Sequence, residues 1–142
     1  MDMKVGNSIL KQCIGQGSFG DVFLATKAGT NQFFAVKRIE KTKAAQIQKY
    51  LINEISILKN LKHPKIIRLL DFQRTSNHFY IITEYCNGGS LSKCLEKFKA
   101  LYHKAFPEDY VQHLMRQIVG AVQYLHNNRI IHRDLKLDNI LV

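Results

Sequence analysis

The octapeptide at positions 132–139 reads His132-Arg133-Asp134-Leu135-Lys136-Leu137-Asp138-Asn139. It places a carboxylate, an ammonium group and a carboxamide on one short segment that follows a long helical pattern. A carboxylate such as Asp134 can orient a hydroxyl and accept its proton, and a cation such as Lys136 can sit on a phosphate. The amide oxygen of Asn139 can help to hold Mg²⁺. These groups indicate phosphoryl transfer, and the alternative is an ordinary polar turn with an Arg133–Asp134 salt bridge.

A glycine-rich segment near the start of the chain reads Gly15-Gln16-Gly17-Ser18-Phe19-Gly20. Glycines at alternate positions let backbone N–H groups approach phosphates without obstruction by Cβ. The same spacing occurs in dinucleotide-binding folds, but there a helix follows the glycines. Here the flanking runs, Ile9–Ile14 and Val22–Thr26, have the composition of strands. We therefore expect a β-hairpin that binds phosphate, with a plain hairpin turn as the alternative.

A lysine stands on the third predicted strand, Gln32–Ile39, where alternation places Lys37 on the same face as Ala35. Burying an unpaired ammonium group is costly, so Lys37 needs an anionic partner. The helical pattern from Lys43 to Asn60 offers one, Glu54, on its apolar stripe. That stripe consists of Ile47, Leu51, Ile55, Leu58 and Leu61. The alternatives are a lysine that extends to solvent and an acid that is solvated at the rim of the stripe.

The remaining segments complete a prediction of fold class. Two more strands, Ile66–Phe72 and His78–Tyr85, would make a five-stranded antiparallel sheet with one helix, a small α+β lobe. A short helix is expected from Leu91 to about Phe98, and a long one starts at Phe106-Pro107-Glu108-Asp109. The long helix has an apolar stripe of Val111, Leu114, Ile118, Val122 and Leu125.

Together these segments resemble the eukaryotic protein kinases, whose catalytic loop reads H-R-D-L-x-x-x-N and whose strand lysine stands in V-A-I-K. Here the second motif is Phe34-Ala35-Val36-Lys37, and Lys136 after the catalytic Asp is typical of serine/threonine members. The resemblance implies a kinase N-lobe in residues 1–85, and a hinge and partial helical C-lobe in residues 86–142. The segment 84–91 makes the chain loosely similar to the autophagy-initiating and NIMA-related kinases.

The resemblance also implies catalytic roles. ATP with Mg²⁺ would be the cofactor, and the partner would be a protein with a Ser or Thr hydroxyl. Asp134 would orient that hydroxyl, Lys136 would contact the transferred phosphate, and Asn139 would be a metal ligand. Lys37 would bind the ATP phosphates and form an ion pair with Glu54.

A further set of residues would bind the nucleotide, again by resemblance. The carbonyl of Glu84 and the amide of Cys86 would contact adenine in the hinge, and Thr83 would stand before the pocket behind it. Because Thr83 is small, we expect that pocket to be accessible. The other expected ATP-binding residues are Ile14, Gly15, Gly17, Gly20, Val22, Ala35 and Leu141.

Composition excludes several classes of protein. The 142 residues are 46% hydrophobic, have no apolar run long enough to cross a bilayer, and begin without a signal-peptide core. The three cysteines, Cys13, Cys86 and Cys94, lack metal-ligand spacing, which favours a reducing, cytoplasmic setting. The net charge of +10 is scattered, without a nucleic-acid-binding signature, and we expect no nucleic-acid partner.

The resemblance covers only the first half of a kinase domain, because no Asp-Phe-Gly or Ala-Pro-Glu follows Asn139. We therefore expect little phosphotransfer by these 142 residues alone, and an exposed apolar stripe on the long helix. Two alternatives stay open: a catalytically inactive nucleotide-binding or scaffolding fragment, and a truncated form of a longer product. The intact Asp134, Lys136 and Asn139 favour the longer product.

Overall fold

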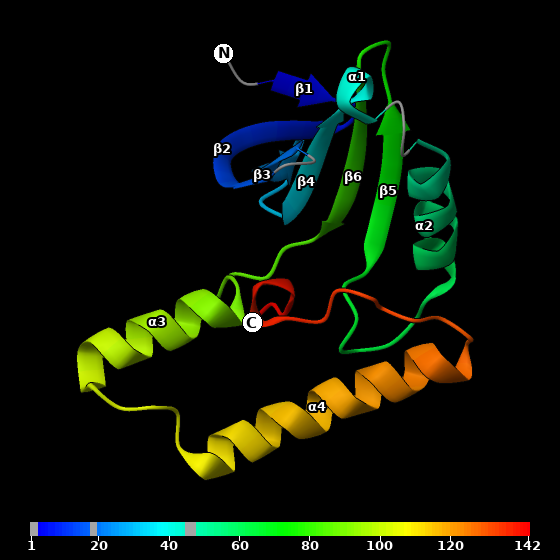
Figure 1. Ribbon diagram of the computed structural model, residues 1–142. Coiled ribbons are helices and arrows are strands. Elements are labelled where there is room, and N and C mark those ends of the chain that lie inside the picture. The colour runs from blue at the N-terminus through cyan, green and yellow to red at the C-terminus, as the bar shows by residue number, and fades with distance from the viewer. Residues whose placement is uncertain (1–2, 18–19, 45–47) are drawn as a thin grey trace. The chain divides into compact units, whose positions relative to one another are not determined.

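The computed structural model describes residues 3–17, 20–44 and 48–142, and its contacts divide the chain into two units (Figure 1). The first unit comprises Met1–Lys62 and Ile67–Tyr85, and the second comprises His63–Ile66 and Cys86–Val142. The short segment His63–Ile66 belongs to the second unit although it precedes the boundary expected after residue 85. One reason is a ring contact, because the centroids of His63 and Tyr124 lie 5.0 Å apart.

The first unit is built on an antiparallel sheet whose strand order is β1-β2-β3-β4-β6-β5. Its strands are β1 (Met3–Val5), β2 (Ser8–Gly17), β3 (Gly20–Lys27), β4 (Phe33–Glu40), β5 (Leu69–Arg74) and β6 (His78–Glu84). Within the described residues the sheet has six strands, one more than expected. The extra strand, β1, is too short to show an alternating pattern. β5 starts later than expected because the chain turns after Pro64 before it becomes extended.

Alternation along β4 separates two hydrophobic clusters. Phe34 and Val36 point into the larger cluster, and Ile39 packs on the opposite face with Leu51 and Phe79. The larger cluster also contains Val5, Leu10, Ala25, Tyr80 and Ile82. Lys37 shares its face with Ile39 and not with the larger core, as the sequence predicted.

Two helical segments stand where the sequence predicted one helix from Lys43 to Asn60. They are α1 (Lys41–Ala44) and α2 (Gln48–Asn60), and the expected stripe residue Ile47 lies outside the described residues. α2 lies beside β5 (Figure 1) and buries Leu51 and Ile55, one helical turn apart.

The second unit contains α3 (Leu91–Tyr102), α4 (Glu108–Asn127) and a short 3₁₀ turn, η1 (Leu137–Asn139). α3 continues past the expected end at Phe98. The ring of Phe98 lies 4.7 Å from that of Tyr102 and 5.0 Å from that of Phe106, which favours an additional helical turn. α4 begins after Pro107 with two acidic residues in its first turn, as predicted.

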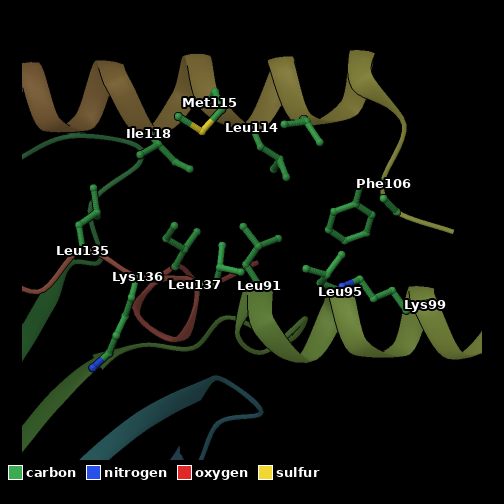
Figure 2. A pocket seen from close by; sticks show the side chains of 13 residues that line it. Leu91, Leu95, Lys99, Phe106, Leu114, Met115, Ile118, Leu135, Lys136 and Leu137 are labelled. Atoms are coloured by element: carbon green, nitrogen blue, oxygen red, sulfur yellow. The ribbon is translucent and has the colours of Figure 1, made fainter.

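An open apolar groove of about 500 Å³ lies between α3, α4 and the segment that contains η1 (Figure 2). Leu91, Leu95, Leu114 and Ile118 line it. Of the predicted stripe on α4, Leu125 is buried and the other four residues are partly buried. The exposure expected for this helix is found beside the stripe, at Met115 and Val119, which are 49% and 58% exposed. None of the helices in the described part of the chain is long and apolar enough to cross a membrane.

Candidate active site

Two residues after α4 have left-handed backbone: Arg129 (φ 61°) in the connection from the helix, and Arg133 (φ 68°) inside the octapeptide. From there the side chains alternate. Leu135 and Leu137 line the apolar groove, and Lys136 between them extends its amine away from α4 (Figure 2). The two leucines thus turn toward the groove, where they are 52% and 44% exposed, while the polar groups of the loop lie together on the other side.

Asp134 is the centre of this polar group. Asn139 Nδ2 donates one hydrogen bond to Asp134 Oδ2, at 2.8 Å, and another to the backbone oxygen of Asp134, at 2.7 Å. Lys136 Nζ lies 3.1 Å from the same carboxylate oxygen. The structure therefore brings together the three polar residues that the sequence singled out on this loop.

The carboxylate of Asp134 is held in its ionised form. Hydrogen bonds from Lys136 and Asn139, with smaller contributions from the charges of Lys136 and His132, lower its pKa below the ordinary value of 3.8. Both partners of the Lys136–Asp134 pair are more than half exposed, at 53% and 65%. Exposed ion pairs contribute little to stability, so this pair adds little to the free energy of folding.

The two residues before Asp134, His132 and Arg133, differ in how they contact it. His132 Nδ1 accepts a hydrogen bond from the backbone N–H of Asp134 at 3.3 Å, and the residue is exposed. Arg133, the partner that an ordinary polar turn would use, forms no ion pair with Asp134 in the described structure, where Asp134 pairs with Lys136.

In the first unit, the glycine-rich segment forms the expected hairpin between β2 and β3, closed by the pair Gly17↔Gly20. Gly20 has φ +144°, and a Cβ there would collide with the backbone oxygen of Arg38. Gly15 and Gly17 have room, with the nearest atoms to an added Cβ at 3.7 Å. Ile14 falls where the register shifts between Cys13 and Gly15. The residues at the tip, Ser18 and Phe19, lie outside the described residues.

The register of the sheet aligns several of the predicted nucleotide-binding residues. Val22 pairs with Gly15 on one side and with Lys37 on the other. Ala35, two residues from Lys37, pairs with Thr83 of β6. Cross-strand partners share a face, so Gly15, Val22, Ala35, Lys37 and Thr83 lie on one face of the sheet.

Glu54 corrects one expectation. It is exposed, and in the described part of the chain no ion pair joins it to Lys37, which is half-buried. The reason is angular: on a helix Glu54 is about 60° from Leu51 and about 100° from Ile55, at the rim of the buried stripe. The solvated rim acid, kept as the alternative, is what the structure contains.

The hinge residues fall at the boundary of the two units. Glu84 ends β6, and its carboxylate accepts a hydrogen bond from the backbone N–H of Arg68 at 2.6 Å. Cys86 and Leu141 belong to the second unit. There Leu141 forms an isolated β-bridge with Ser90, just before α3.

Metal-binding groups are sparse. In the ranges that the structure covers, no three residues of the His, Cys, Asp and Glu types gather closely enough to hold an ion. Asn139 fits the role expected for it, because its Nδ2 is used by Asp134 and its Oδ1 is left to act as a ligand. Mg²⁺ is commonly held by few protein oxygens together with substrate phosphates, which suits this donor set.

Two features were missed by the sequence prediction. Arg38 Nη2 forms a salt bridge with Asp21 Oδ2 at 3.0 Å, next to the glycine hairpin. Ser92 donates a hydrogen bond to Asp138, a residue 46 positions away. Alternation predicts which face a side chain takes, but it gives no signal for a contact across so long a separation.

The chain is similar in sequence to known proteins over nearly its whole length. The family described as protein kinase domain matches residues 9–142 of the chain. Human serine/threonine-protein kinase ULK1 is 43% identical over 133 residues, which is 93% of this chain and 12% of that protein.

Two other relatives are similarly close. Mitogen-activated protein kinase kinase kinase ANP1 of Arabidopsis thaliana is 41% identical over 92% of this chain. Serine/threonine-protein kinase ATG1 of Debaryomyces hansenii is 34% identical over 91% of it. The chain spans only 20% and 17% of the lengths of these two relatives.

Proposed function

The chain belongs to the protein kinase family and has serine/threonine kinases as relatives, and from this premise we propose that it transfers phosphate from ATP to Ser or Thr hydroxyls of a protein. The observation that carries the proposal is the arrangement of Lys136 and Asn139 around the ionised carboxylate of Asp134. That arrangement holds a proton acceptor, a cation and an amide oxygen on one short loop, as phosphoryl transfer requires.

Asp134 and Lys136 have different tasks in this proposal. Asp134 accepts a hydrogen bond from the substrate hydroxyl and takes its proton as the oxygen attacks. At neutral pH the carboxylate of Asp134 is ionised, since its pKa lies below an ordinary value that is already acidic, and the ionised form is the one that can take the proton. Lys136, 3.1 Å from Asp134 Oδ2, is close enough to neutralise charge on the transferred phosphoryl group.

Asn139 both orients the base and offers an oxygen to a metal. Its two hydrogen bonds to Asp134 fix the side-chain amide, so that Oδ1 faces away from the carboxylate. When bound, ATP with Mg²⁺ supplies the phosphoryl group and the neutralisation of phosphate charge.

The nucleotide is held, in this proposal, by the face of the sheet that carries Gly15, Val22, Ala35 and Lys37. Val22 and Ala35 would contact adenine, together with Ile14 and Leu141, and the hairpin glycines would direct N–H groups at the phosphates. Glu84 and Cys86 would contact the adenine edge with backbone groups. The ammonium group of Lys37 would pair with phosphate oxygens.

The 142 residues contain no Asp-Phe-Gly motif, and these residues alone would transfer phosphate poorly. The protein would act in the cytoplasm on a protein substrate. A second candidate, a nucleotide-binding fragment without catalysis, is favoured by the separation of Glu54 from Lys37, because active kinases form that ion pair.

The test is phosphotransfer by the native-length protein from γ-labelled ATP to a generic Ser/Thr substrate. Asp134→Asn should lower kcat about 10²- to 10⁴-fold and leave ATP affinity unchanged. Lys37→Met should weaken ATP binding. The matched control is Asp109→Asn, at the exposed start of α4. One outcome would replace the enzyme by the nucleotide-binding candidate: Lys37→Met weakens ATP binding, but the unmodified protein phosphorylates the substrate no faster than background.

A further inference from the structure

The first turn of α3 is tied to the end of the catalytic loop by backbone hydrogen bonds within the second unit. The N–H of Leu91 donates to Ile140 at 2.8 Å, and the N–H of Val142 donates to Gly89 at 2.9 Å. The N–H of Gly88 also donates to Val142, at 2.8 Å. These bonds hold residues 140–142, directly after η1, against the segment that leads into α3.

A side-chain bond extends this connection into η1 itself. Ser92 Oγ lies 2.6 Å from Asp138 Oδ1, the central residue of the turn. Ser92 Oγ is also 2.9 Å from Ser90 Oγ, which in turn accepts from the backbone N–H of Lys93 at 3.4 Å. Three hydrogen bonds therefore form one continuous chain.

The direction of this chain follows from its ends. An ionised carboxylate only accepts, so the single proton of the Ser92 hydroxyl is committed to Asp138. Ser90 must then donate to Ser92, and its lone pair receives the N–H of Lys93. Donors aligned in one direction polarise each other, and the bond to the charged acceptor gains most.

Asp138 also supplies a charge that α3 lacks. No acidic residue stands in the first turn of α3, where the helix dipole favours a negative charge. Ser90 is already the N-cap, since its hydroxyl accepts from Lys93. Ser92 is therefore not needed as a cap, and its hydroxyl can bond to Asp138 on the loop.

The turn transmits this contact to the site. It is closed by the N–H of Asn139 to Lys136 at 2.9 Å and by the N–H of Ile140 to Leu137 at 3.4 Å. Leu137 lines the apolar groove (Figure 2), and Asp138 is held by Ser92. Asn139, the next residue, directs its amide to Asp134.

We propose that Ser92 is a positioning residue of the catalytic loop: through Asp138 it fixes the turn that presents Asn139 to Asp134 and to the metal. The inference rests on the proposed function for its consequence in catalysis. The expected effect of the Ser92–Asp138 bond on the rigidity of the turn does not depend on phosphotransfer.

The first experiment measures hydrogen exchange of the Asn139 and Ile140 amides in the nucleotide-free, native-length protein. Ser92→Ala should speed exchange at both amides about tenfold, because the bond it removes ends on a charged group. Ser92→Thr, which keeps the hydroxyl, should restore protection. Asp138→Ala should match Ser92→Ala, and the double variant should add little, since both remove the same contact.

Two control variants separate the contact from general effects on α3. Lys93→Ala changes a neighbouring exposed side chain on the same turn and should leave exchange at Asn139 unchanged. Ser90→Ala removes the N-cap while the Ser92–Asp138 bond stays possible, so it should loosen α3 more than the turn.

The second measurement is the Mg²⁺ dependence of phosphotransfer. Ser92→Ala should raise the half-saturating Mg²⁺ concentration several-fold and leave the KM for peptide unchanged. If exchange at Asn139 and Ile140 is the same in Ser92→Ala as in the unmodified protein, the proposal is wrong, whatever the activity. An unmodified protein without phosphotransfer would overturn the proposed function alone, and exchange would still decide the role of Ser92.

Discussion

One amide nitrogen, Asn139 Nδ2, donates hydrogen bonds to both the carboxylate and the backbone oxygen of Asp134, at 2.8 and 2.7 Å. These two hydrogen bonds join the ends of the segment from Asp134 to Asn139 and set the direction of the carboxylate. It also decides which end of the Asn139 carboxamide faces the base, and leaves the oxygen for a cation.

Replacement of Asn139 should therefore act on Asp134. Asn139→Asp would exchange a donor for a second carboxylate near Asp134 Oδ2, and like charges raise the pKa of one member of such a pair. Asn139→Ala removes the two bonds without adding charge. In a titration of the Asp134 carboxyl carbon by NMR, we expect the larger rise in pKa for Asn139→Asp, and equal rises would contradict this view.

The pH dependence of Asp134 should follow from Lys136, the largest cause of its lowered pKa. Lys136→Met should move the pKa up toward 3.8. Because the folded-state pKa is depressed, the stabilisation from this contact is present above the unfolded pKa and is lost as pH falls through the folded value. The measurement is the NMR titration midpoint of the Asp134 carboxyl group, with Lys93→Met as the matched control. An unchanged midpoint in Lys136→Met would show that Lys136 is not the main cause of the lowered pKa.

The glycines of the hairpin should differ in their tolerance of alanine. Gly20→Ala places a Cβ against the backbone oxygen of Arg38 at φ +144°, which should cost about 1–3 kcal/mol of unfolding free energy. Gly17→Ala, with its nearest atom at 3.7 Å, should be tolerated in folding and should instead weaken ATP binding. Chemical denaturation measures the unfolding free energies of both variants. Equal values would contradict the prediction and would mean that the backbone at Gly20 can move to accept a Cβ.

Glu54 should affect catalysis without affecting the stability of the nucleotide-free protein. Since it is exposed and not paired with Lys37, Glu54→Gln should change the unfolding free energy by less than about 0.5 kcal/mol. If ATP binding brings the ion pair together, the same variant should lower kcat. Glu96→Gln on α3, also exposed, is the control. A stability loss of several kcal/mol in Glu54→Gln alone would mean that the pair already exists.

Burial along α4 gives a last prediction. Leu125 is 7% exposed and Val119 is 58% exposed. Leu125→Ala should leave a cavity and cost about 2–5 kcal/mol, whereas Val119→Ala should change stability by less than about 0.5 kcal/mol. Denaturant titration of the 142-residue chain measures the unfolding free energy of both variants. Similar losses of stability in the two would indicate that Val119 is covered in solution.

Much of the architecture was readable from local pattern. Alternation in β4 predicted that Phe34 and Val36 face away from Lys37, and the clusters agree. The run after Gly20 predicted a hairpin in place of a helix, and β2 and β3 pair as expected. These predictions succeed because side-chain direction in a strand depends on the backbone alone.

Other features depended on packing that no short window contains. α3 runs to Tyr102 because its ring meets Phe98, and Phe98 in turn meets Phe106. The strand β1 exists because Val5 finds Ser8 across a turn and joins the larger hydrophobic cluster. Such pairings are decided by neighbours, and they outweigh intrinsic propensity over a few residues.

Contiguous motifs were enough to predict the family, the glycine hairpin and the identity of the polar residues on the loop. Tertiary structure decided that Glu54 lies at the solvated rim of α2, and that Ser92 reaches Asp138 across 46 positions. The physical reason is that ion pairs and hydrogen bonds form at distances of a few ångströms, and those distances are set by packing, not by order along the chain.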